Sequence, residues 1–234
     1  MRPYRTKIIA SAFALSIAAL AVTATAASIW QLQATPASGD LNGISAPSLD
    51  FAMAVGNGGT IVRFDNGSTG TLMNSGTTND LFDVYATAPS MAAAAGRDTV
   101  LLWDGNDWNP IRSSSDGSIY TGTWITPEQD LVLYDVINGG GFDYVCPYVP
   151  GATTQGFCRT FGAAMVATCG HSGDIKVINE NGDVFHVDNT LADLDATYPI
   201  FSQPIPLNLN AVWAPQLDCL PGAFPPQTLF AIAN

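Results

Sequence analysis

Carboxylates are the most abundant side chains in this sequence that could catalyse a reaction or bind a metal, with 20 Asp and Glu among 234 residues. Asp104, Asp107 and Asp116 lie in stretches rich in Gly, Asn and Ser. Short polar side chains in such stretches start turns, and we interpret these carboxylates as turn residues. A calcium site at 104–107 is the alternative, because closely spaced oxygen ligands suit Ca²⁺, although the EF-hand pattern is absent. No pair of carboxylates stands out as catalytic.

Histidine chemistry has little support. The sequence contains two histidines, His171 and His186, and Asp188 would lie on the same side of a strand as His186. A Ser-His-Asp relay needs a nucleophile turn such as G-x-S-x-G, which is absent, so His186 is interpreted as an exposed strand residue. Asn138 and the three glycines after it predict a turn, because no helix follows them to bind a phosphate. We expect no catalytic residue and no cofactor, which favours a protein that is not an enzyme.

The cysteines predict disulfides. All four lie in the second half of the chain: Cys146, Cys158, Cys169 and Cys219. An even number in an oxidising compartment indicates disulfides, and four cysteines permit three pairings. Cys146 with Cys158 would clamp the base of a short excursion, and Cys169 with Cys219 would then join neighbouring repeats. A zinc site at Cys169 and His171 lacks a second pair of ligands at the usual spacing, so no metal is expected.

The elements that position these side chains form a repeat of about 40 residues. Two units show the same order of strand, strand, Gly-containing turn, strand ending in Asp, Gly turn and strand. The expected strands are Leu41–Ser48, Phe51–Gly56, Thr60–Asp65 and Thr71–Asn74, then Leu81–Ser90, Ala92–Gly96, Thr99–Asp104 and Trp108–Ser114.

Weaker copies of the unit follow along the chain, at Ile119–Trp124, Asp130–Val136, Asp174–Asp188, Leu209–Pro215 and Thr228–Asn234. No long amphipathic helix is expected between them. A period of about 40 residues with four short strands is the signature of β-propeller blades. Each sheet of this kind covers its apolar faces only against neighbouring blades. The sequence therefore predicts an all-β propeller of about five blades.

A family resemblance supports this fold. The strings Ala54–Asp65 and Ser75–Tyr85 resemble the repeat of bacterial exported β-propellers related to photosystem II assembly-factor and BNR-like repeat proteins. The resemblance is strong over residues 41–118 and weak beyond them. It implies a propeller with a binding or scaffolding role, and it implies no particular ligand because such propellers are functionally diverse.

The ends of the chain offer strands for a last blade. Ile29–Ala34 precedes the first unit as Thr71–Asn74 precedes the second, so it is a candidate outer strand. The C-terminus supplies two inner strands and stops at Asn234. Joining both ends would close the ring with a blade one strand short and remove an open sheet edge. The alternative is a fragment of a larger ring.

Recurring aromatic residues are the candidate ligand-binding set. Tyr85, Trp124 and Trp213 recur near the end of the first strand of their units. They would lie at similar depth around the ring and could stack on sugar rings or hold a peptide. Alternatively they fill the wedge between blades. Trp103 and Trp108 flank a turn and are expected to form a cross-strand pair.

The N-terminus predicts export. The first seven residues carry three positive charges, residues 8–22 are apolar, and 24–26 are small. This is the layout of a bacterial secretory signal peptide, expected over residues 1–27, with the propeller over 28–234. The apolar run is shorter than the roughly 20 residues of a spanning helix, which disfavours the alternative of an uncleaved anchor. We expect a secreted or periplasmic protein.

The charge balance limits the partners. Without residues 1–27 the chain keeps five basic residues against 20 acidic ones, a formal charge of −15. Such a surface repels nucleic acids and anionic membranes. The expected function is that of a non-catalytic binding or scaffolding module that recognises a protein segment or a glycan through loops on one propeller face, compatible with a monomer.

A propeller-type glycoside hydrolase acting on extracellular sugars is the alternative function. Ser113–Tyr120 resembles the sialidase Asp-box, but Asp116 adjoins Gly117 directly and no Trp follows at the required place. The arginines occupy unmatched positions of their repeats, which disfavours an arginine cluster around a carboxylate: Arg63, Arg97, Arg112 and Arg159. Hydrolysis would also need two opposed carboxyl groups, which a sequence cannot place.

Overall fold

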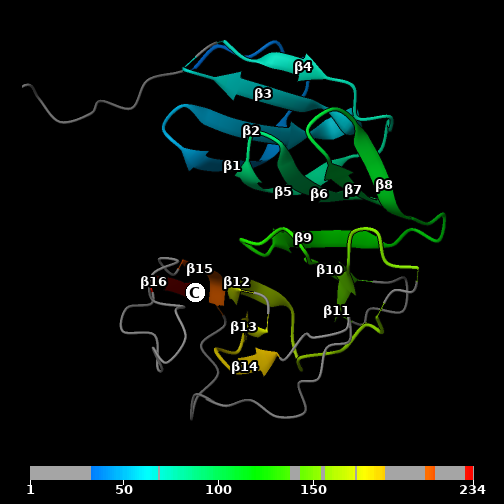
Figure 1. Ribbon diagram of the computed structural model, residues 1–234, viewed down its shortest axis with the longest axis vertical. Coiled ribbons are helices and arrows are strands. Elements are labelled where there is room, and N and C mark those ends of the chain that lie inside the picture. The colour runs from blue at the N-terminus through cyan, green and yellow to red at the C-terminus, as the bar shows by residue number, and fades with distance from the viewer. Residues whose placement is uncertain are drawn as a thin grey trace, which may run out of the picture. The chain divides into compact units, whose positions relative to one another are not determined.

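The protein is all-β where its structure is described. The computed structural model describes residues 33–67, 69–137, 143–153, 156–171 and 173–187, and strands Leu209–Trp213 and Phe230–Ala233 (Figure 1). These residues form five antiparallel sheets and one 3₁₀ turn, Asn57–Gly59, with no α-helix among them. Among them, no helix is long and apolar enough to cross a membrane. The predicted signal peptide lies outside the described residues.

The first two sheets are complete four-stranded blades in which each strand pairs with the next along the chain. Blade 1 consists of β1 (Leu41–Ser48), β2 (Phe51–Gly56), β3 (Ile61–Asp65) and β4 (Thr71–Met73). Blade 2 consists of β5 (Leu81–Ala88), β6 (Met91–Gly96), β7 (Thr99–Trp103) and β8 (Trp108–Ser113). All eight strands were predicted, with boundaries that differ by a few residues.

The remaining sheets have fewer described strands. Blade 3 consists of β9 (Ile119–Ile125), β10 (Val132–Ile137) and β11 (Asp143–Tyr148), and blade 4 of β12 (Met165–His171), β13 (Asp174–Asn179) and β14 (Val184–Val187). Blade 5 pairs β15 (Leu209–Trp213) with β16 (Phe230–Ala233). In blade 3, an isolated antiparallel bridge pairs Val145 of β11 with Arg159.

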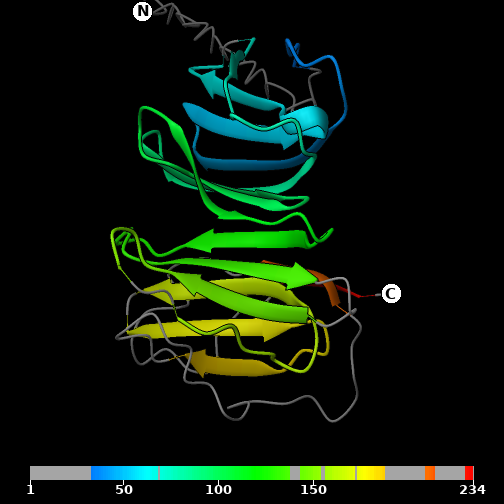
Figure 2. The same cartoon turned by 90° about the vertical axis from the view of Figure 1, so that its right-hand side faces the viewer.

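Hydrogen bonds between blades follow the 40-residue period. The Asn42 side-chain amide donates to the Leu81 carbonyl at 2.8 Å, 39 residues away. The Thr123 N–H donates to an oxygen of Asp83 at 2.8 Å, 40 residues away. These bonds join the first strands of successive blades, and Figure 2 shows the sheets following one another in chain order. The repeat seen in the sequence is therefore the spacing of equivalent positions in neighbouring blades.

Two glycines at the end of the second strand of their blades explain part of this repeat. A Cβ atom at Gly56 would lie 2.0 Å from the Asp40 carbonyl oxygen, and one at Gly96 would lie 2.1 Å from that of Asp80. The backbone before each blade thus passes directly over the glycine, and the next N–H, of Asn57 or Arg97, donates to that same carbonyl. Any side chain at these two positions would push the entering chain away.

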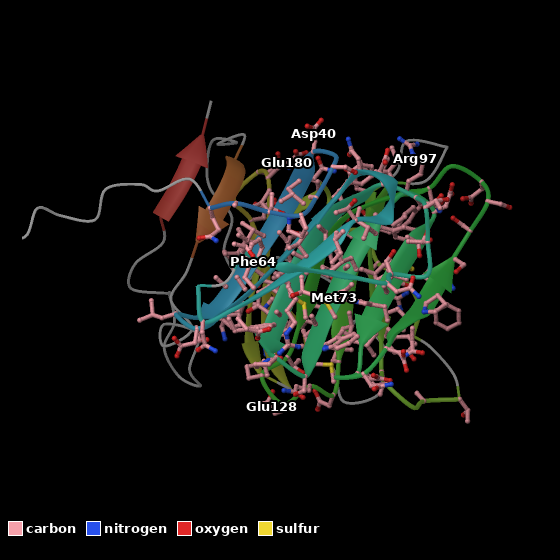
Figure 3. All side chains as sticks on the ribbon, turned by 90° about the horizontal axis from the view of Figure 1, so that it is seen from above. Asp40, Phe64, Met73, Arg97, Glu128 and Glu180 are labelled. Atoms are coloured by element: carbon pink, nitrogen blue, oxygen red, sulfur yellow. A yellow bond between two sulfur atoms is a disulfide. The ribbon has the colours of Figure 1, made fainter. Side chains whose placement is uncertain are left out.

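The core lies between blades. One cluster of buried side chains joins blades 1 and 2, two join blades 2 and 3, and one joins blades 3 and 4. Figure 3 looks down this series of sheets, with Arg97 at one end of the strands and Glu128 at the other. Neighbouring sheets cover each other's apolar faces, as predicted for propeller blades.

Closure of the ring stays a prediction. Of the candidate strand 29–34, residues 29–32 lie outside the described residues, and Gln33 and Ala34 are not in a strand. Strand β15 contacts β12 of blade 4, so the C-terminal pair continues the series of sheets.

Candidate functional site

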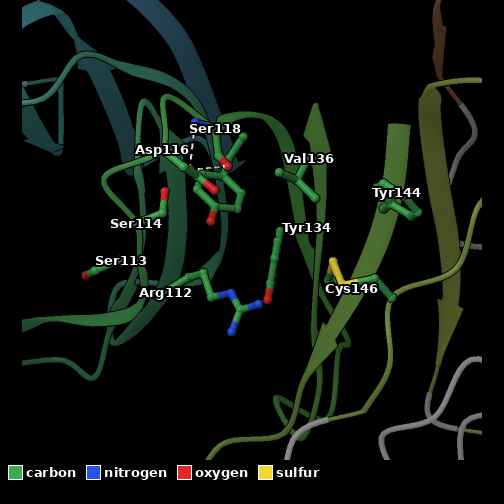
Figure 4. A pocket seen from close by; sticks show the side chains of 11 residues that line it. Arg112, Ser113, Ser114, Asp116, Ser118, Tyr134, Val136, Tyr144 and Cys146 are labelled. Atoms are coloured by element: carbon green, nitrogen blue, oxygen red, sulfur yellow. Dashed lines mark hydrogen bonds between the residues drawn. A yellow bond between two sulfur atoms is a disulfide. The ribbon is translucent and has the colours of Figure 1, made fainter. Parts of the chain in front are cut away.

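A cavity of about 380 Å³ lies between blades 2 and 3 (Figure 4). Strand β8 and the loop that follows it form one wall, and the sheet β9–β10–β11 forms the other. We call this space the interblade cavity. Its lining residues are Arg112, Ser113, Ser114, Asp116, Ser118, Tyr120, Tyr134, Val136, Tyr144, Cys146 and Cys158.

The loop at the rim is held by carboxylates. Asp98, in the turn between β6 and β7, accepts hydrogen bonds from the Ser114 hydroxyl and the Gly117 N–H, both at 2.9 Å. Asp116 accepts from the hydroxyl of Ser118 at 2.6 Å and from its N–H at 3.1 Å. The Ser118 hydroxyl is the main reason that the pKa of Asp116 is lowered, so this carboxyl is ionised at neutral pH. The rim is thereby fixed.

Tyrosines form the floor. Tyr120 on β9 and Tyr134 on β10 are both buried, and their rings meet edge to face at 5.7 Å. Burial raises the pKa of Tyr134, with a partly opposing effect from the positive charge of Arg112. The phenol therefore stays neutral at physiological pH and can donate a hydrogen bond. Figure 4 shows the Arg112 guanidinium directed toward the Tyr134 hydroxyl.

The disulfide contributes to the second wall. Cys146 and Cys158 are bonded, with their Cα atoms 4.1 Å apart, which confirms the predicted pair. The proposed partners Cys169 and Cys219 are not tested, because the Cys169 side chain and the whole of Cys219 lie outside the described structure. Phe157, next to Cys158 in the chain, has 73% of its surface exposed.

The predicted aromatic set lies elsewhere. Tyr85 and Trp124 contact each other, with ring centroids 6.2 Å apart, but neither lines the interblade cavity. Trp124 is only 4% exposed and belongs to the core between blades 3 and 4, whereas Tyr85 is half-buried. This burial favours the packing alternative for Trp124. Trp213 lies on β15, and its side chain is not among those described.

Other predicted residues have structural roles. Asp104 accepts from the N–H groups of Asn106 and Asp107 at 2.9 and 2.8 Å, which lowers the pKa of Asp104 and confirms the predicted turn. His186 is exposed on β14, as expected. Trp103 and Trp108 form the predicted pair, 5.6 Å apart. The described residues contain no cluster of three potential metal ligands.

The sequence analysis did not identify two buried carboxylates that lie between blades. Asp135 is 1% exposed, accepts from the Thr121 hydroxyl at 2.9 Å, and has a second oxygen without a hydrogen-bond partner among the described residues. Burial raises the pKa of Asp135 to about 6. Burial also raises the pKa of Asp83, which accepts the Thr123 N–H. An Asp inside the apolar strand Leu131–Ile137 was the available signal for the first of these.

The comparisons with known proteins establish the fold. No protein-family model and no curated protein matches the chain. Among solved structures, the chain is similar to the WD40 β-propeller domain of Doa1, with a TM-score of 0.52 and 12% sequence identity. The match covers 75% of this chain and 59% of that domain, so the chain spans well under two thirds of its length. The protein is thus an all-β propeller repeat protein, as predicted, while the bacterial assembly-factor or BNR-like grouping stays a prediction.

Proposed function

We propose that the protein is exported and acts as a non-catalytic binding module that recognises a protein segment or a glycan at the interblade cavity. The propeller fold, which often mediates binding, supports this function at the coarse level. The cavity supplies the more specific support.

The observation that carries the proposal is the composition of this cavity. Its volume of about 380 Å³ falls within the usual range for ligand sites. Aromatic faces from Tyr134 and Tyr144, serine hydroxyls along the rim and one guanidinium converge on it. A loop anchored by Asp98 and a wall joined by a disulfide keep these groups in place before a ligand arrives. A preorganised site of this kind binds without a large ordering cost.

Export is supported by two independent features. The N-terminal sequence has the three parts of a signal peptide. The disulfide Cys146–Cys158 is typical of proteins that fold in an oxidising compartment. A secreted or periplasmic bacterial location accounts for both features.

The hydrolase alternative has less support. Glycoside hydrolysis ordinarily uses two carboxyl groups on opposite sides of the bond. Among the described residues that line the cavity, Asp116 is the only carboxylate, and hydrogen bonds, chiefly from the Ser118 hydroxyl, already lower its pKa. Asp135, whose pKa is raised, does not line the cavity. The site therefore suits recognition better than catalysis.

The test uses the full chain expressed with its own N-terminus. Protein recovered from the periplasm or medium is sequenced at its N-terminus and screened against glycan and peptide arrays. Tyr144→Ala, in the cavity wall, should abolish binding of the ligands found, whereas Tyr85→Ala, half-buried outside the cavity, should leave binding unchanged. Wild-type protein that binds nothing on either array, or that turns over a bound glycan, would contradict the proposal.

A further inference from the structure

Arg112 is the arginine that lines the interblade cavity, and it differs from three other basic side chains of the described structure. Arg63 forms an ion pair with Asp65 at 2.8 Å, and Lys176 is buried. Arg159 donates to the Cys158 carbonyl oxygen. Arg112 is exposed at the interblade cavity, and no carboxylate among the described residues forms an ion pair with it.

The chain is strongly acidic, with 20 Asp and Glu against eight Lys and Arg. Arg97 and Arg112 are both exposed and form no ion pair with a described carboxylate, but only Arg112 of the two lines the cavity, where a ligand could reach it. A guanidinium presents five N–H donors in a planar fork that matches a carboxylate with two parallel hydrogen bonds. The Arg112 side chain points into the cavity beside the neutral hydroxyl of Tyr134 (Figure 4). One end of the cavity is therefore built to accept a small anionic group.

The rest of the cavity suits a sugar ring. The Ser113 hydroxyl can donate to and accept from a ring hydroxyl, whereas the hydroxyls of Ser114 and Ser118, which donate to Asp98 and Asp116, can accept from one. Tyr144 adds a half-buried aromatic ring at the opposite wall. A volume of about 380 Å³ accommodates one or two sugar units.

A peptide added as an extra strand fits less well. The edge strand beside the cavity is β8, and Pro110 within it has no N–H to offer an added strand. The overall negative charge of the chain also disfavours a polyanion, whose many charges would be repelled at long range. A single acidic sugar carries one charge, which the Arg112 guanidinium can neutralise, while Asp116 at the rim, which already accepts a hydrogen bond from Ser118, is left to the neutral ring hydroxyls.

We infer that the interblade cavity binds a sugar acid, a single uronic-acid-type unit of a glycan, whose carboxylate is held by Arg112 while its ring lies among the tyrosines and serines. This inference rests on the proposed binding function and names its ligand class. Arg112 is the residue that distinguishes the acid from the neutral sugar.

The experiment compares three probes on the protein recovered after export of the full chain: methyl β-D-glucuronide, methyl β-D-glucoside and N-acetyl-dialanine. The glucuronide and glucoside differ in a carboxylate against a hydroxymethyl group, and the dipeptide offers a carboxylate without a sugar. NMR titration gives each dissociation constant. We expect the glucuronide to bind about tenfold or more tightly than the other two, the effect of one charge-assisted hydrogen-bonded pair.

Variants assign this preference to one side chain. Arg112→Gln should weaken glucuronide binding about tenfold and leave glucoside binding unchanged. Arg112→Lys should restore part of the loss, because the charge returns without the fork. Arg97→Gln is the matched control, since Arg97 is also exposed but does not line the cavity, and it should bind like wild type.

The outcomes separate this inference from the proposed function. Equal binding of glucuronide and glucoside, or unchanged glucuronide binding in Arg112→Gln, overturns the sugar-acid inference while the binding function stands. Tighter binding of the dipeptide overturns it in favour of a peptide carboxylate. If array screening finds no ligand that depends on Tyr144, the proposed function itself fails.

Discussion

Blades 1 and 2 differ from blade 3 in how their outer edges are held. Blades 1 and 2 have four strands each, and every strand is joined to the next by an antiparallel ladder. Blade 3 has three strands among the described residues, and beyond β11 the described pairing is reduced to the bridge between Val145 and Arg159. In the register of that bridge, the next opposed pair is Cys146 and Cys158, the pair that is bonded. A covalent bond thus stands where blades 1 and 2 have a fourth strand.

The interiors of the two regions also differ. The second strand of blade 2 carries four consecutive alanines, Ala92–Ala95, all fully buried. The corresponding strand of blade 3 carries Tyr134 and Asp135, which are larger and polar. Small apolar side chains let neighbouring sheets approach closely, whereas the tyrosine and its partners frame the interblade cavity. Small side chains therefore pack blade 2 closely, and the candidate site lies where blade 2 meets the larger side chains of blade 3.

The largest expected loss of stability comes from leucine substitutions, which test whether the core between blades 1 and 2 and the core between blades 3 and 4 are equally well packed. Leu81 in the core between blades 1 and 2 and Leu133 in the core between blades 3 and 4 are both 0% exposed. Leu81→Ala and Leu133→Ala should each lower the free energy of unfolding by about 2–5 kcal/mol, measured by urea titration. A loss below about 1 kcal/mol for Leu133→Ala alone would mean that the second core is loosely packed.

Removal of the disulfide should destabilise blade 3 and leave blade 1 unaffected. Because the bond closes a loop with a sequence separation of 12, the double variant Cys146→Ala/Cys158→Ala should lose about 3 kcal/mol. Hydrogen exchange should quicken in β10 and β11, while the amides of β2 and β6 keep their protection. Equal quickening in blade 1 would show that the bond stabilises the whole propeller and not only the shortened sheet.

The strands of blades 1 and 2 were largely predictable from the sequence, for a physical reason. Its strands alternate with tight turns, and equivalent residues such as Gly56 and Gly96 recur because the same backbone approach recurs. Cys146 and Cys158 were also paired correctly, since they flank a short excursion. Each of these features depends on residues that are close together in the sequence or that recur at a fixed spacing, so the sequence alone could predict it.

The candidate site was not predictable in the same way. The interblade cavity brings Arg112 from β8 next to Tyr134 from β10, and no periodicity places these two side chains together. Recurrence singled out Tyr85 and Trp124, whose rings lie 6.2 Å apart, but recurrence does not reveal how far each ring is buried. Trp124 is covered by side chains of blade 4, a contact that depends on how two sheets pack.

The buried carboxylate of blade 3 should give that region a pH dependence. The pKa of Asp135 is about 6 in the folded protein, above its ordinary value of 3.8. Its contribution to stability is therefore complete below about pH 4 and is lost as the pH rises through 6. Asp135→Asn cannot ionise and should be more stable than wild type by about 2–3 kcal/mol at pH 8, with little change at pH 4. Urea titrations at both pH values measure this difference.

The control for this pH dependence is Asp116→Asn at the cavity rim. Because the pKa of Asp116 is lowered, its ionised form stabilises the fold, and the variant should lose stability at neutral pH, a change of the opposite sign. If Asp135→Asn were less stable than wild type at pH 8, the ionised carboxylate would have a partner whose interaction exceeds the free-energy cost of burying the charge.

The smallest expected loss of stability concerns the hydrogen bonds that anchor the loop between one blade and the next. In blade 1, Asp80 accepts a single bond from the Gly58 N–H, whereas in blade 2 Asp98 accepts two from the cavity rim. Asp98 has a φ of 55°, so Asp98→Gly removes both bonds without backbone strain and should cost about 1 kcal/mol. Asp98→Asn, whose side-chain oxygen still accepts both bonds, should stay within a few tenths of wild type. Urea titration measures the stability, and hydrogen exchange at Gly117 and Ser118 should quicken in the glycine variant only. Equal losses in both variants would mean that the charge of Asp98, rather than its position as an acceptor, keeps the rim of the cavity in place.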